Sequence, residues 1–232
     1  MKFALIGHPV EHSFSAQYLN SRFKSEGIDA HYELIDLPDI SEFQTLIKSG
    51  KYNGFNVTIP HKRAIIPYLD SHSPEATAIR AVNVIQITNN KLIGHNTDII
   101  GFHETLTPLL KPYHTHAVIL GTGGASQAVQ YVLHKLNIPF RLVTHKELDA
   151  NIITQLAPII INTTPLGMHP NTDTVPNIDY TQLTDKHLIY DLVYNPTETR
   201  FLQLAKQQGA TTQNGLAMLH RQADAALKIW LK

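Results

Sequence analysis

A glycine-rich turn in the second half of the chain is of the kind that binds phosphates. An apolar segment at 116–121 leads into Gly121-Thr122-Gly123-Gly124-Ala125-Ser126, and a segment with helical spacing follows at once. In such a turn the first glycine permits the tight bend, the second lets a pyrophosphate approach the backbone, and the helix N-terminus supplies N–H groups. The alternative is an ordinary turn between a strand and a helix. Its position between two such elements favours a dinucleotide site.

The residues after the next predicted strand bear on which dinucleotide binds. An NAD site places an acidic residue about 20 positions after the glycines, where it holds the ribose 2′-OH. Here the strand at 140–144 ends in Thr144-His145-Lys146, and Glu147 is the first acidic residue beyond it. A cation with hydroxyl and imidazole groups suits a 2′-phosphate better, so this segment favours NADP. The alternative is a solvated turn that touches no ligand.

Polar side chains recur directly after the predicted strands of the first half. They are Ser13 and Ser15, Thr58, His61 and Lys62, Asn83, and Asn96-Thr97-Asp98. Since α/β sheets bind ligands at the carboxyl ends of their strands, this group predicts a site for a small, hydroxyl-rich ligand. Ser and Asn are also common helix caps, so each alone is as easily structural. Lys62 and Asp98 offer a proton donor and its charge partner, which can polarise a carbonyl while a hydride arrives.

The elements that must position these residues alternate between strands and helices. In the first half we expect strands at 2–6, 31–37 and 54–59, helices at 14–26, through Phe43 to near Gly50 and from Pro60, and a hairpin at 81–94 around Asn89-Asn90. In the second half we expect strands at 116–121, 140–144, 158–164 and 187–193, a helix after the glycine turn, and a last helix from Leu216. This α/β pattern restarts once, so it predicts two compact domains with a boundary near 97–115.

Length and composition exclude several classes of protein. The 232 residues suffice for one or two domains with a real core. There is no Cys, which excludes disulfides and a cysteine nucleophile, and no apolar run approaches the length of about 18 residues typical of a membrane span. Lys+Arg and Asp+Glu both total 19, so we expect no nucleic-acid partner. His114 and His116 alone make no metal site. We expect a cytoplasmic protein, either a monomer or a homodimer.

Eight segments, in order along nearly the whole chain, resemble the shikimate dehydrogenase family. They are GHPVEHSFS (7–15), FNVTIPHK (55–62), AVN (81–83), GHNTDIIGF (94–102), GTGGA (121–125), NTTPLGM (162–168), DLVYNPTET (191–199) and NGLAMLHRQA (214–223). The resemblance implies reduction of 3-dehydroshikimate to shikimate with NADPH, in aromatic amino-acid biosynthesis. It implies an α/β fold with a substrate domain over 1–101, completed by the helix 216–232, and a Rossmann-type NADP-binding domain over 102–215.

The resemblance also implies roles for single residues. Lys62 and Asp98 match the family's catalytic pair. The positions that match substrate-binding groups are Ser13, Ser15, Thr58, Asn83, Asp98, Tyr194 and Gln222. The positions that match cofactor-binding groups are Gly121, Thr122, Gly123, Gly124 and Ala125 in the pyrophosphate loop, together with Leu192 and Gly215 facing the nicotinamide.

The sequence departs from the family pattern in four places. Ser15-Ala16 replaces the usual Ser-Pro, Arg80 replaces the Gly before Ala-Val-Asn, and Thr144-His145-Lys146 replaces the Asn-Arg-Thr motif that grips the 2′-phosphate. The segment from there to Asn162 is also short by roughly one helix and one strand, so the cofactor domain is trimmed. Two alternatives stay open: a quinate/shikimate dehydrogenase that uses NAD, and a shikimate-binding protein with weak redox activity.

Overall fold

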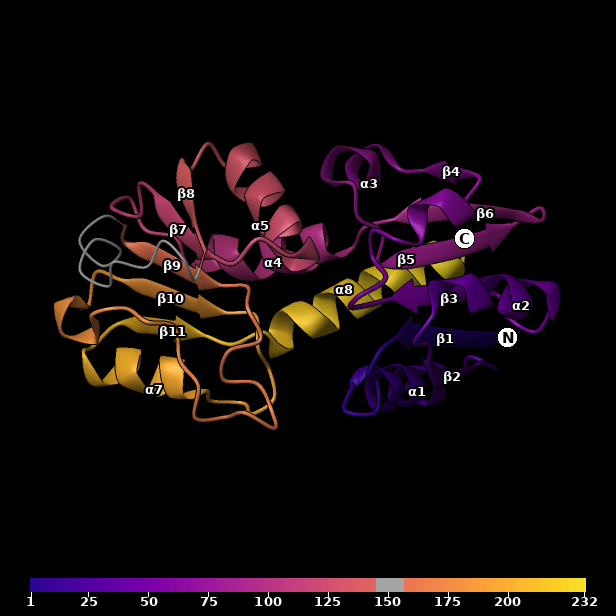
Figure 1. Ribbon diagram of the computed structural model, residues 1–232, viewed down its shortest axis with the longest axis horizontal. Coiled ribbons are helices and arrows are strands. Elements are labelled where there is room, and N and C mark those ends of the chain that lie inside the picture. Colours follow the sequence, from indigo (N-terminus) through magenta and orange to yellow (C-terminus); the bar gives the residue numbers. More distant parts are fainter. Residues whose placement is uncertain (145–156) are drawn as a thin grey trace. The chain divides into compact units, whose positions relative to one another are not determined.

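The computed structural model describes residues 1–144 and 157–232. These residues divide into two compact units, Met1–Ile100 with His220–Lys232, and Gly101–Leu219. Each unit is a sheet with helices packed against it (Figure 1), so the predicted α/β fold is confirmed. In the described part of the chain, no helix is long and apolar enough to span a membrane. The assignment of a substrate domain and a cofactor domain to particular residue ranges stays a prediction.

The first unit is built on a six-stranded sheet in the order β2-β1-β3-β5-β6-β4. β1 (Lys2–Gly7) runs parallel to β2 (His31–Asp36) and β3 (Gly54–Val57). β5 (Val84–Thr88) runs antiparallel to β3 and to β6 (Lys91–His95), and β4 (Ser71–His72) pairs in parallel with β6. The helices of this unit are α1 (Ser15–Glu26), α2 (Phe43–Lys48), α3 (Pro74–Ile79) and the latter part of α8 (Leu216–Trp230).

Both faces of β1 are buried. Successive side chains of a strand point to opposite faces of the sheet. Phe3 and Leu5 accordingly join a cluster formed with α1 and α8, while Ala4 and Ile6 join a second cluster that includes Phe43 of α2. Because water reaches neither face, the strand is an unbroken apolar run rather than an alternating one. This explains why the short apolar segment Phe3-Ala4-Leu5-Ile6 forms a central strand.

The predicted hairpin around Asn89-Asn90 is confirmed. β5 and β6 pair in antiparallel register from Val84 opposite His95 to Thr88 opposite Lys91. The two residues between the strands have φ of 49° and 58°. Left-handed backbone at both positions of a two-residue loop matches the twist of the flanking strands, and Asn tolerates it better than most residues.

The prediction of a helix starting at Pro60 is wrong. Residues 60–64 form turns, in which the His61 N–H donates to the Thr58 carbonyl. The His61 side chain is buried and bonds the Leu37 carbonyl, which holds the segment beside the end of β2. A proline at a helix start merely lacks an N–H that would go unused there, so it permits a helix without enforcing one.

The second unit is a parallel five-stranded sheet in the order β11-β10-β9-β7-β8. The strands are β7 (Ala117–Leu120), β8 (Phe140–Val143), β9 (Ile159–Asn162), β10 (Leu188–Asp191) and β11 (Thr211–Gln213). The helices described are α4 (Asp98–Leu106), which begins within the first unit, α5 (Gly124–Lys135) and α7 (Arg200–Gln207). β11, α4 and α7 were not predicted. The chain passes from β7 to β8 on one side and returns to β9 on the other, which is the strand-order reversal where doubly wound sheets bind ligands.

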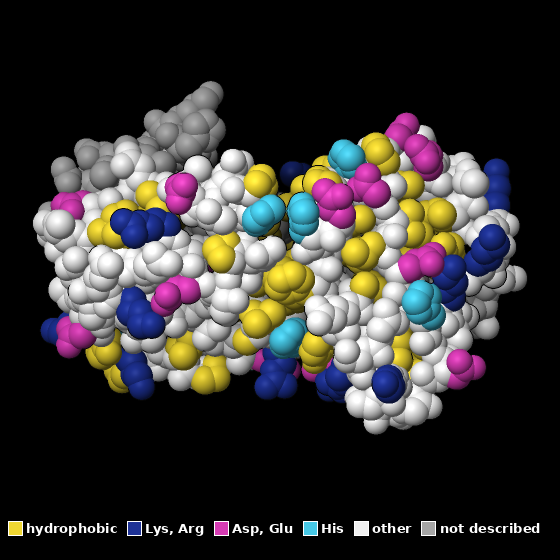
Figure 2. Space-filling model, turned by 90° about the horizontal axis from the view of Figure 1, so that it is seen from below, with side chains coloured by type: hydrophobic (Ala, Val, Ile, Leu, Met, Phe, Trp, Pro, Cys, Tyr) yellow, Lys and Arg dark blue, Asp and Glu magenta, His cyan; other side chains and the backbone are white. Residues whose placement is uncertain are grey.

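Charges of both signs are interspersed on the face shown in Figure 2. Lys and Arg side chains and Asp and Glu side chains are both spread over it, in small groups of either sign. The formal net charge of the chain is zero. Such a face generates little long-range field, so it lacks the electrostatic footprint of a polyanion-binding surface.

The end of α8 packs against the middle of the first sheet. The Trp230 indole stacks on Phe3 with ring centroids 4.5 Å apart, and its Nε1 donates to the Ile85 carbonyl at 3.0 Å. This fit depends on Gly54 in β3. A Cβ at position 54 would lie 2.5 Å from Trp230 Nε1 and 2.9 Å from the Ile85 oxygen, closer than packed atoms approach.

We therefore expect Gly54→Ala to lower the free energy of unfolding by about 1–3 kcal/mol, because overpacking forces the indole or the strand to shift. Urea denaturation followed by tryptophan fluorescence measures this, since Trp230 is the only tryptophan in the chain. Gly123→Ala is the matched control, because a Cβ there meets no atom within 4 Å in the part of the chain that the structure describes. Equal stability of the two variants would contradict the packing argument.

Candidate functional site

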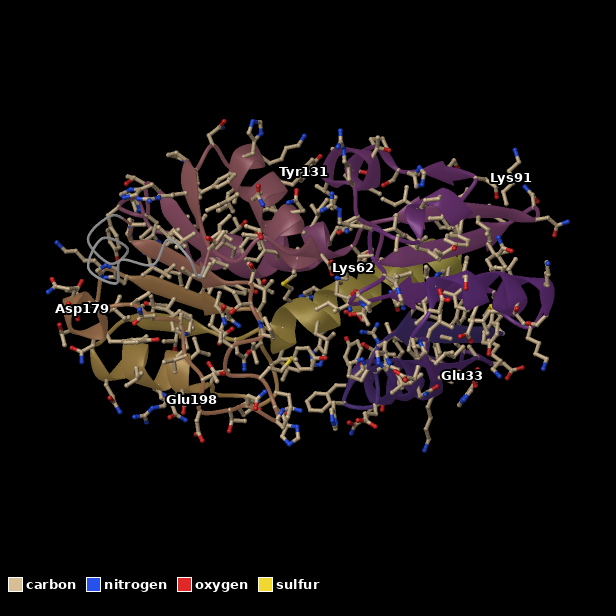
Figure 3. The ribbon with its side chains drawn as sticks, in the orientation of Figure 1. Glu33, Lys62, Lys91, Tyr131, Asp179 and Glu198 are labelled. Atoms are coloured by element: carbon tan, nitrogen blue, oxygen red, sulfur yellow. The ribbon has the colours of Figure 1, made fainter. Side chains whose placement is uncertain are left out.

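Lys62 and Asp98 form a nearly buried ion pair in the first unit. The Lys62 Nζ donates to Asp98 Oδ2 at 2.6 Å, and the two side chains are only 15% and 7% exposed (Figure 3). The Lys62 carbonyl accepts from the Val82 N–H, which anchors the lysine backbone beside the start of β5. Asp98 is the first residue of α4, where the helix dipole stabilises a carboxylate. The structure thus brings together the acid–base pair that the sequence predicts.

The Asn83 carboxamide organises the groups around this pair. Its Nδ2 donates to Asp98 Oδ1 at 2.9 Å and to Thr97 Oγ1 at 3.0 Å, and it lies 3.2 Å from Gln222 Oε1. Its Oδ1 accepts from the Thr97 N–H at 2.7 Å, which fixes the orientation of the amide. Thr97 Oγ1 also lies 3.3 Å from Gln222 Oε1. Asn83 therefore contacts both Asp98, which was predicted with it, and Gln222, which only the family resemblance indicated.

A second layer of hydrogen bonds holds Asn83 from behind. The Asn56 Nδ2 donates to the Asn83 carbonyl at 3.0 Å, and the Tyr32 hydroxyl donates to Asn56 Oδ1 at 2.7 Å. All three side chains are buried. Burial raises the pKa of the Tyr32 phenol well above its ordinary value, so the phenol remains a hydrogen-bond donor. A chain of hydrogen bonds thus runs from Tyr32 of β2 through Asn56 of β3 to Asn83, the residue before β5.

The predicted serines and Thr58 lie at the same sheet edge of this unit. The Ser13 hydroxyl donates to the Ser15 hydroxyl at 3.2 Å, and the Ser15 N–H donates to Ser13 Oγ at 3.3 Å. The Thr58 N–H donates to the Ile6 carbonyl, and the Thr58 methyl fills the space beside Gly7, where a Cβ would lie 2.3 Å from it. The serines therefore follow the end of β1, and Thr58 follows the end of β3.

The glycine turn after β7 has the geometry of a phosphate-binding loop. Gly121 has φ of +103°, and a Cβ there would lie 2.8 Å from both Thr163 Oγ1 and Thr164 Cγ2, so only glycine fits. Gly123 precedes the first residue of α5, and the space around its Cα is open. Thr122, Gly124 and Ala125 complete the loop, with backbone N–H groups at a helix N-terminus where an anion is favoured. This loop fits a pyrophosphate.

Thr144 follows β8 and is half-buried. His145 and Lys146, predicted beside the 2′-phosphate, lie outside the described residues.

Leu192 and Gly215 are in direct backbone contact in the second unit. A Cβ at position 215 would lie 2.0 Å from the Leu192 oxygen, and the Gly215 N–H donates to the Val193 carbonyl at 3.1 Å. The Leu192 N–H donates to the Asn162 carbonyl at 3.0 Å, which ties this contact to the end of β9. Tyr194, predicted to contact substrate, is half-buried two residues beyond Leu192 in the same unit.

The buried carboxylate of Asp191 is a feature that sequence reasoning missed. At the end of β10 it is fully buried and accepts from Asn162 Nδ2 at 2.9 Å, from the Val193 N–H at 3.0 Å and from Thr199 Oγ1 at 2.6 Å. Burial nevertheless raises the pKa of Asp191 to about 6. The available signal was an acidic residue at the end of an otherwise apolar strand. Thr97 was noted among the polar residues but given no role.

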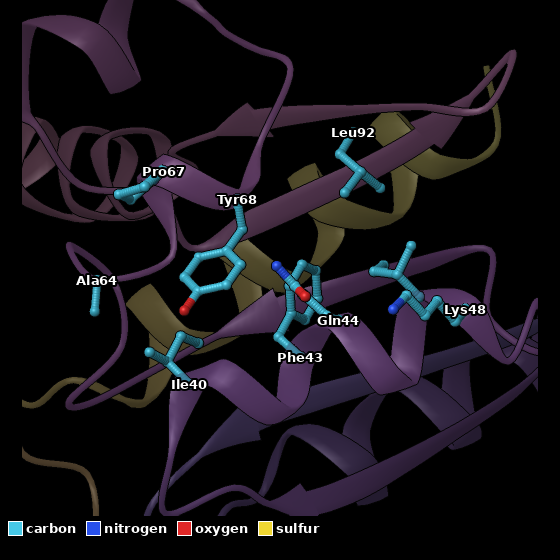
Figure 4. Close-up of a pocket in the computed structure, with 9 residues that line it drawn as sticks. Ile40, Phe43, Gln44, Lys48, Ala64, Pro67, Tyr68 and Leu92 are labelled. Atoms are coloured by element: carbon cyan, nitrogen blue, oxygen red, sulfur yellow. The ribbon is translucent and has the colours of Figure 1, made fainter.

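An apolar groove in the first unit lies apart from this chemistry. It has a volume of about 670 Å³ and is lined by Ile40, Phe43, Gln44, Ile47, Lys48, Ala64, Pro67, Tyr68 and Leu92 (Figure 4). Lys48 is the charged side chain among these described lining residues, and it has no acidic partner there. The groove therefore lacks an acid–base pair, and the candidate site is the cluster around Lys62 and Asp98.

Comparisons with known proteins point to one family. Residues 5–85 match the model of the shikimate dehydrogenase substrate binding domain. The chain is 38% identical to a shikimate dehydrogenase (NADP(+)) of Staphylococcus haemolyticus, over 99% of this chain and 92% of that protein. A shikimate 5-dehydrogenase of Thermus thermophilus, crystallised with NADP(H) and shikimate, superposes with a TM-score of 0.89 at 31% identity, covering 99% of this chain and 93% of that one.

A third relative bears on the choice of cofactor. A shikimate 5-dehydrogenase of Listeria monocytogenes, crystallised with shikimate and NAD, has a TM-score of 0.83 at 27% identity, covering 99% of this chain and 91% of that one.

The alignment with the Staphylococcus protein spans 249 positions, which exceeds the 232 residues of this chain by 17. The alignment therefore contains positions that this chain lacks, and their location before Asn162 stays a prediction.

The open space at Gly123 provides a test of the phosphate-binding loop. Gly123→Ala should leave the thermal unfolding temperature within a degree or two, since the new methyl meets no atom of the described residues within 4 Å. It should still weaken NADPH binding about tenfold or more, because the methyl occupies the space that a pyrophosphate needs close to the backbone. Titration by NADPH fluorescence measures the affinity. Unchanged affinity would remove this turn from the cofactor site.

Asp191 should make the stability of the protein depend on pH in an unusual direction. Its folded-state pKa of about 6 lies above the ordinary value of 3.8, so the folded state binds the extra proton between these values. The contribution of Asp191 to the free energy of unfolding therefore falls by roughly 2–3 kcal/mol as the pH rises from about 4 to 7. Relative to wild type, Asp191→Asn should become more stable by that amount across the same window.

Denaturation curves of both proteins at several pH values measure this difference, because their other titrating groups are the same. Asp179→Asn is the control with the opposite sign. Hydrogen bonds from the Thr181 hydroxyl and N–H lower the pKa of Asp179. The free energy of unfolding of wild type should therefore rise relative to that of Asp179→Asn as the pH rises through the acid range. A pH-independent difference for Asp191→Asn would refute the raised pKa.

Proposed function

The chain belongs to the shikimate dehydrogenase family, and on that premise we propose that the NADPH-dependent reduction of 3-dehydroshikimate to shikimate takes place at the cluster of Lys62, Asn83, Thr97, Asp98 and Gln222. The observation that carries this proposal is the ion pair of Lys62 and Asp98 at 2.6 Å, with both side chains largely withdrawn from water. A lysine held in this way can donate a proton to a carbonyl oxygen. A lysine that served only the packing of the protein would not need to be withdrawn from water beside a carboxylate.

The chemistry divides between the cofactor and the chain. NADPH, when bound, supplies the hydride that reaches the carbonyl carbon. Lys62 Nζ donates a hydrogen bond to the carbonyl oxygen, stabilises the negative charge that develops there and delivers the proton that completes the alcohol. In the oxidation of shikimate the same nitrogen accepts that proton. One hydride and one proton balance the conversion of C=O to CH–OH.

Asp98 keeps the lysine in position for this step. Its Oδ2 accepts from Lys62 while its Oδ1 accepts from Asn83, so the carboxylate cannot rotate without breaking one of the two bonds. Such an arrangement aims the ammonium group before the substrate arrives, and little reorganisation remains for the reaction itself. Asp98 is therefore proposed to orient Lys62 and to accept a hydrogen bond from a ring hydroxyl.

The remaining polar groups are proposed to bind the substrate. Ser13 and Ser15 carry adjacent hydroxyls that can donate to the substrate carboxylate. Thr58, Asn83 and Gln222 offer the hydroxyl and amide groups that a ring bearing hydroxyls and a carbonyl needs, and an amide serves as both donor and acceptor. Tyr194 is proposed as a further substrate contact, on the family resemblance alone.

The second unit is proposed to hold NADP. The loop from Gly121 to Ala125 would hold the pyrophosphate at the N-terminus of α5, and Leu192 and Gly215 would face the nicotinamide. Thr144, His145 and Lys146 would bind the 2′-phosphate. Lys is a point charge where Arg would be a bidentate fork, so the preference for NADPH over NADH should be real but reduced.

Two residue ranges complete the proposal. We assign the substrate domain to 1–101 with 216–232 and the NADP-binding domain to 102–215. The division of the described residues into Met1–Ile100 with His220–Lys232 and Gly101–Leu219 supports this assignment.

We further propose that the protein acts in the cytoplasm as a monomer or a homodimer.

A direct assay tests the proposal against its alternatives. The purified chain is mixed with NADPH and 3-dehydroshikimate, and absorbance at the nicotinamide band is followed, with NADH run in parallel and quinate offered in the reverse direction. We expect turnover with NADPH and shikimate-type substrates. Faster turnover with NADH, together with oxidation of quinate, would favour the NAD-dependent alternative, and binding of shikimate without turnover would favour the binding protein.

Lys62→Ala tests the assigned proton donor. The kcat should fall by about two to four decades, the range for loss of a general acid–base group, while the unfolding temperature stays close to wild type. Lys91→Ala is the control, because Lys91 is exposed at the start of β6 (Figure 3) and should leave kcat unchanged. A Lys62 variant that keeps more than half of the wild-type kcat would disprove the role.

A further inference from the structure

Tyr18 of α1 contacts α8 at two residues within the first unit. Its hydroxyl donates to Asp224 Oδ1 at 2.8 Å, and its ring stacks on the His220 ring with centroids 4.1 Å apart and planes within 7°. The Arg22 guanidinium donates to the same Asp224 oxygen at 2.8 Å. We call Tyr18, Arg22, His220 and Asp224 the Tyr18 clamp. Nothing in the proposed function uses these four residues.

The clamp contacts the side of α8 that lies opposite Gln222. Successive residues of an α-helix are rotated by about 100°, so His220 and Asp224, four apart, share one face. Gln222 is two residues from each and is therefore rotated by about 200°, which directs it away from α1. Its Oε1 meets Asn83 Nδ2 at 3.2 Å and Thr97 Oγ1 at 3.3 Å.

The buried side chains of α8 directly beside Gln222 are small. Ala223 and Ala226 have methyl groups that give little directional fit, and the larger buried side chains Met218, Leu227 and Trp230 lie further along the helix on either side. A polar contact of defined geometry at this level therefore adds to what fixes the rotation of the helix. Burial raises the pKa of Tyr18 and lowers that of His220, so the hydroxyl remains a donor and the stacked imidazole remains neutral at physiological pH.

The clamp also connects the two ends of the proposed substrate site. Tyr18 lies one turn beyond Ser15, which is the first residue of α1, and Ser15 accepts a hydrogen bond from the Ser13 hydroxyl just before the helix. Any shift of α1 against α8 would change the separation between the serine pair and Gln222. One side chain therefore links the helix that carries the serines to the helix that carries the amide.

We propose that the Tyr18 clamp is a positioning device for Gln222, which sets the rotation of α8 so that the amide meets the substrate ring at the correct distance from the serine pair. This inference rests on the proposed role of Gln222. It makes Tyr18 and Asp224 determinants of substrate affinity, although neither contacts the substrate.

Steady-state kinetics of three variants test the inference. Tyr18→Phe keeps the ring stack and removes one hydrogen bond, and Asp224→Ala removes both bonds to the carboxylate. The KM for 3-dehydroshikimate should rise about threefold in the first and about tenfold in the second, with the KM for NADPH within twofold of wild type. Glu26→Ala is the control, since it removes the other partner of Arg22, on α1 itself, without touching α8.

A double-mutant cycle separates positioning from a general loss of structure. In a Gln222→Ala background, Asp224→Ala should raise the substrate KM less than twofold further, because no amide is left to position. If the KM increases caused by the two substitutions multiply in the double variant, the inference is overturned and the clamp is a structural contact. An unchanged substrate KM in Asp224→Ala, beside a raised one in Gln222→Ala, would overturn the inference alone. An unchanged KM in Gln222→Ala would remove the proposed role of Gln222 and the clamp's role with it.

Discussion

The Asn83 side chain and backbone together hold the candidate site in one piece. Its backbone N–H donates to the His95 carbonyl and its carbonyl accepts from the Val57 N–H, so the residue is locked between β3 and β6. Its carboxamide then bonds Asp98 and Thr97 at the start of α4 and approaches Gln222 of α8. Another side chain of the same size would leave at least two buried groups without partners, which explains why an amide stands here.

The ion pair of Lys62 and Asp98 is stable because the surrounding protein satisfies its charges. Withdrawing two charges from water is costly, and a bare pair rarely recovers that cost. Here the carboxylate receives a second hydrogen bond from Asn83 and sits at a helix N-terminus. The same neighbours that make the pair tolerable also orient it, so stability and reactivity are served by one set of contacts.

Local chemistry made several features predictable from the sequence. The Asn89-Asn90 hairpin and the strict need for glycine at 121 both follow from backbone preferences of single residues, and both agree with the structure. The pairing of Lys62 with Asp98 was expected because both follow strands of one sheet. The segment after Pro60 was mispredicted because a tertiary contact, the buried His61 side chain on Leu37, decides its course.

Other features depend on pairings that no local pattern reveals. Asp191 is satisfied by Asn162 and Thr199, which come from two other segments, so its burial could not be read from the strand that carries it. The short β11 has three residues, too few for a period to show. The rotation of α8 depends on Tyr18, some 200 residues earlier in the chain. Sequence patterns predict single helices and strands, whereas these features depend on contacts between helices and strands that lie far apart in the chain.

The location of Trp230 affects the order in which the chain can fold during synthesis. Gly101–Leu219 is one continuous stretch, so the second unit has all of its residues as soon as position 219 has been made. The first unit begins with β1 but needs Trp230 and its neighbours to cover the Phe3 face of that strand. During synthesis α1 can cover part of this face early, but the part that Trp230 covers stays exposed until α8 has been made, and chaperones that shield exposed strands can act on it until then.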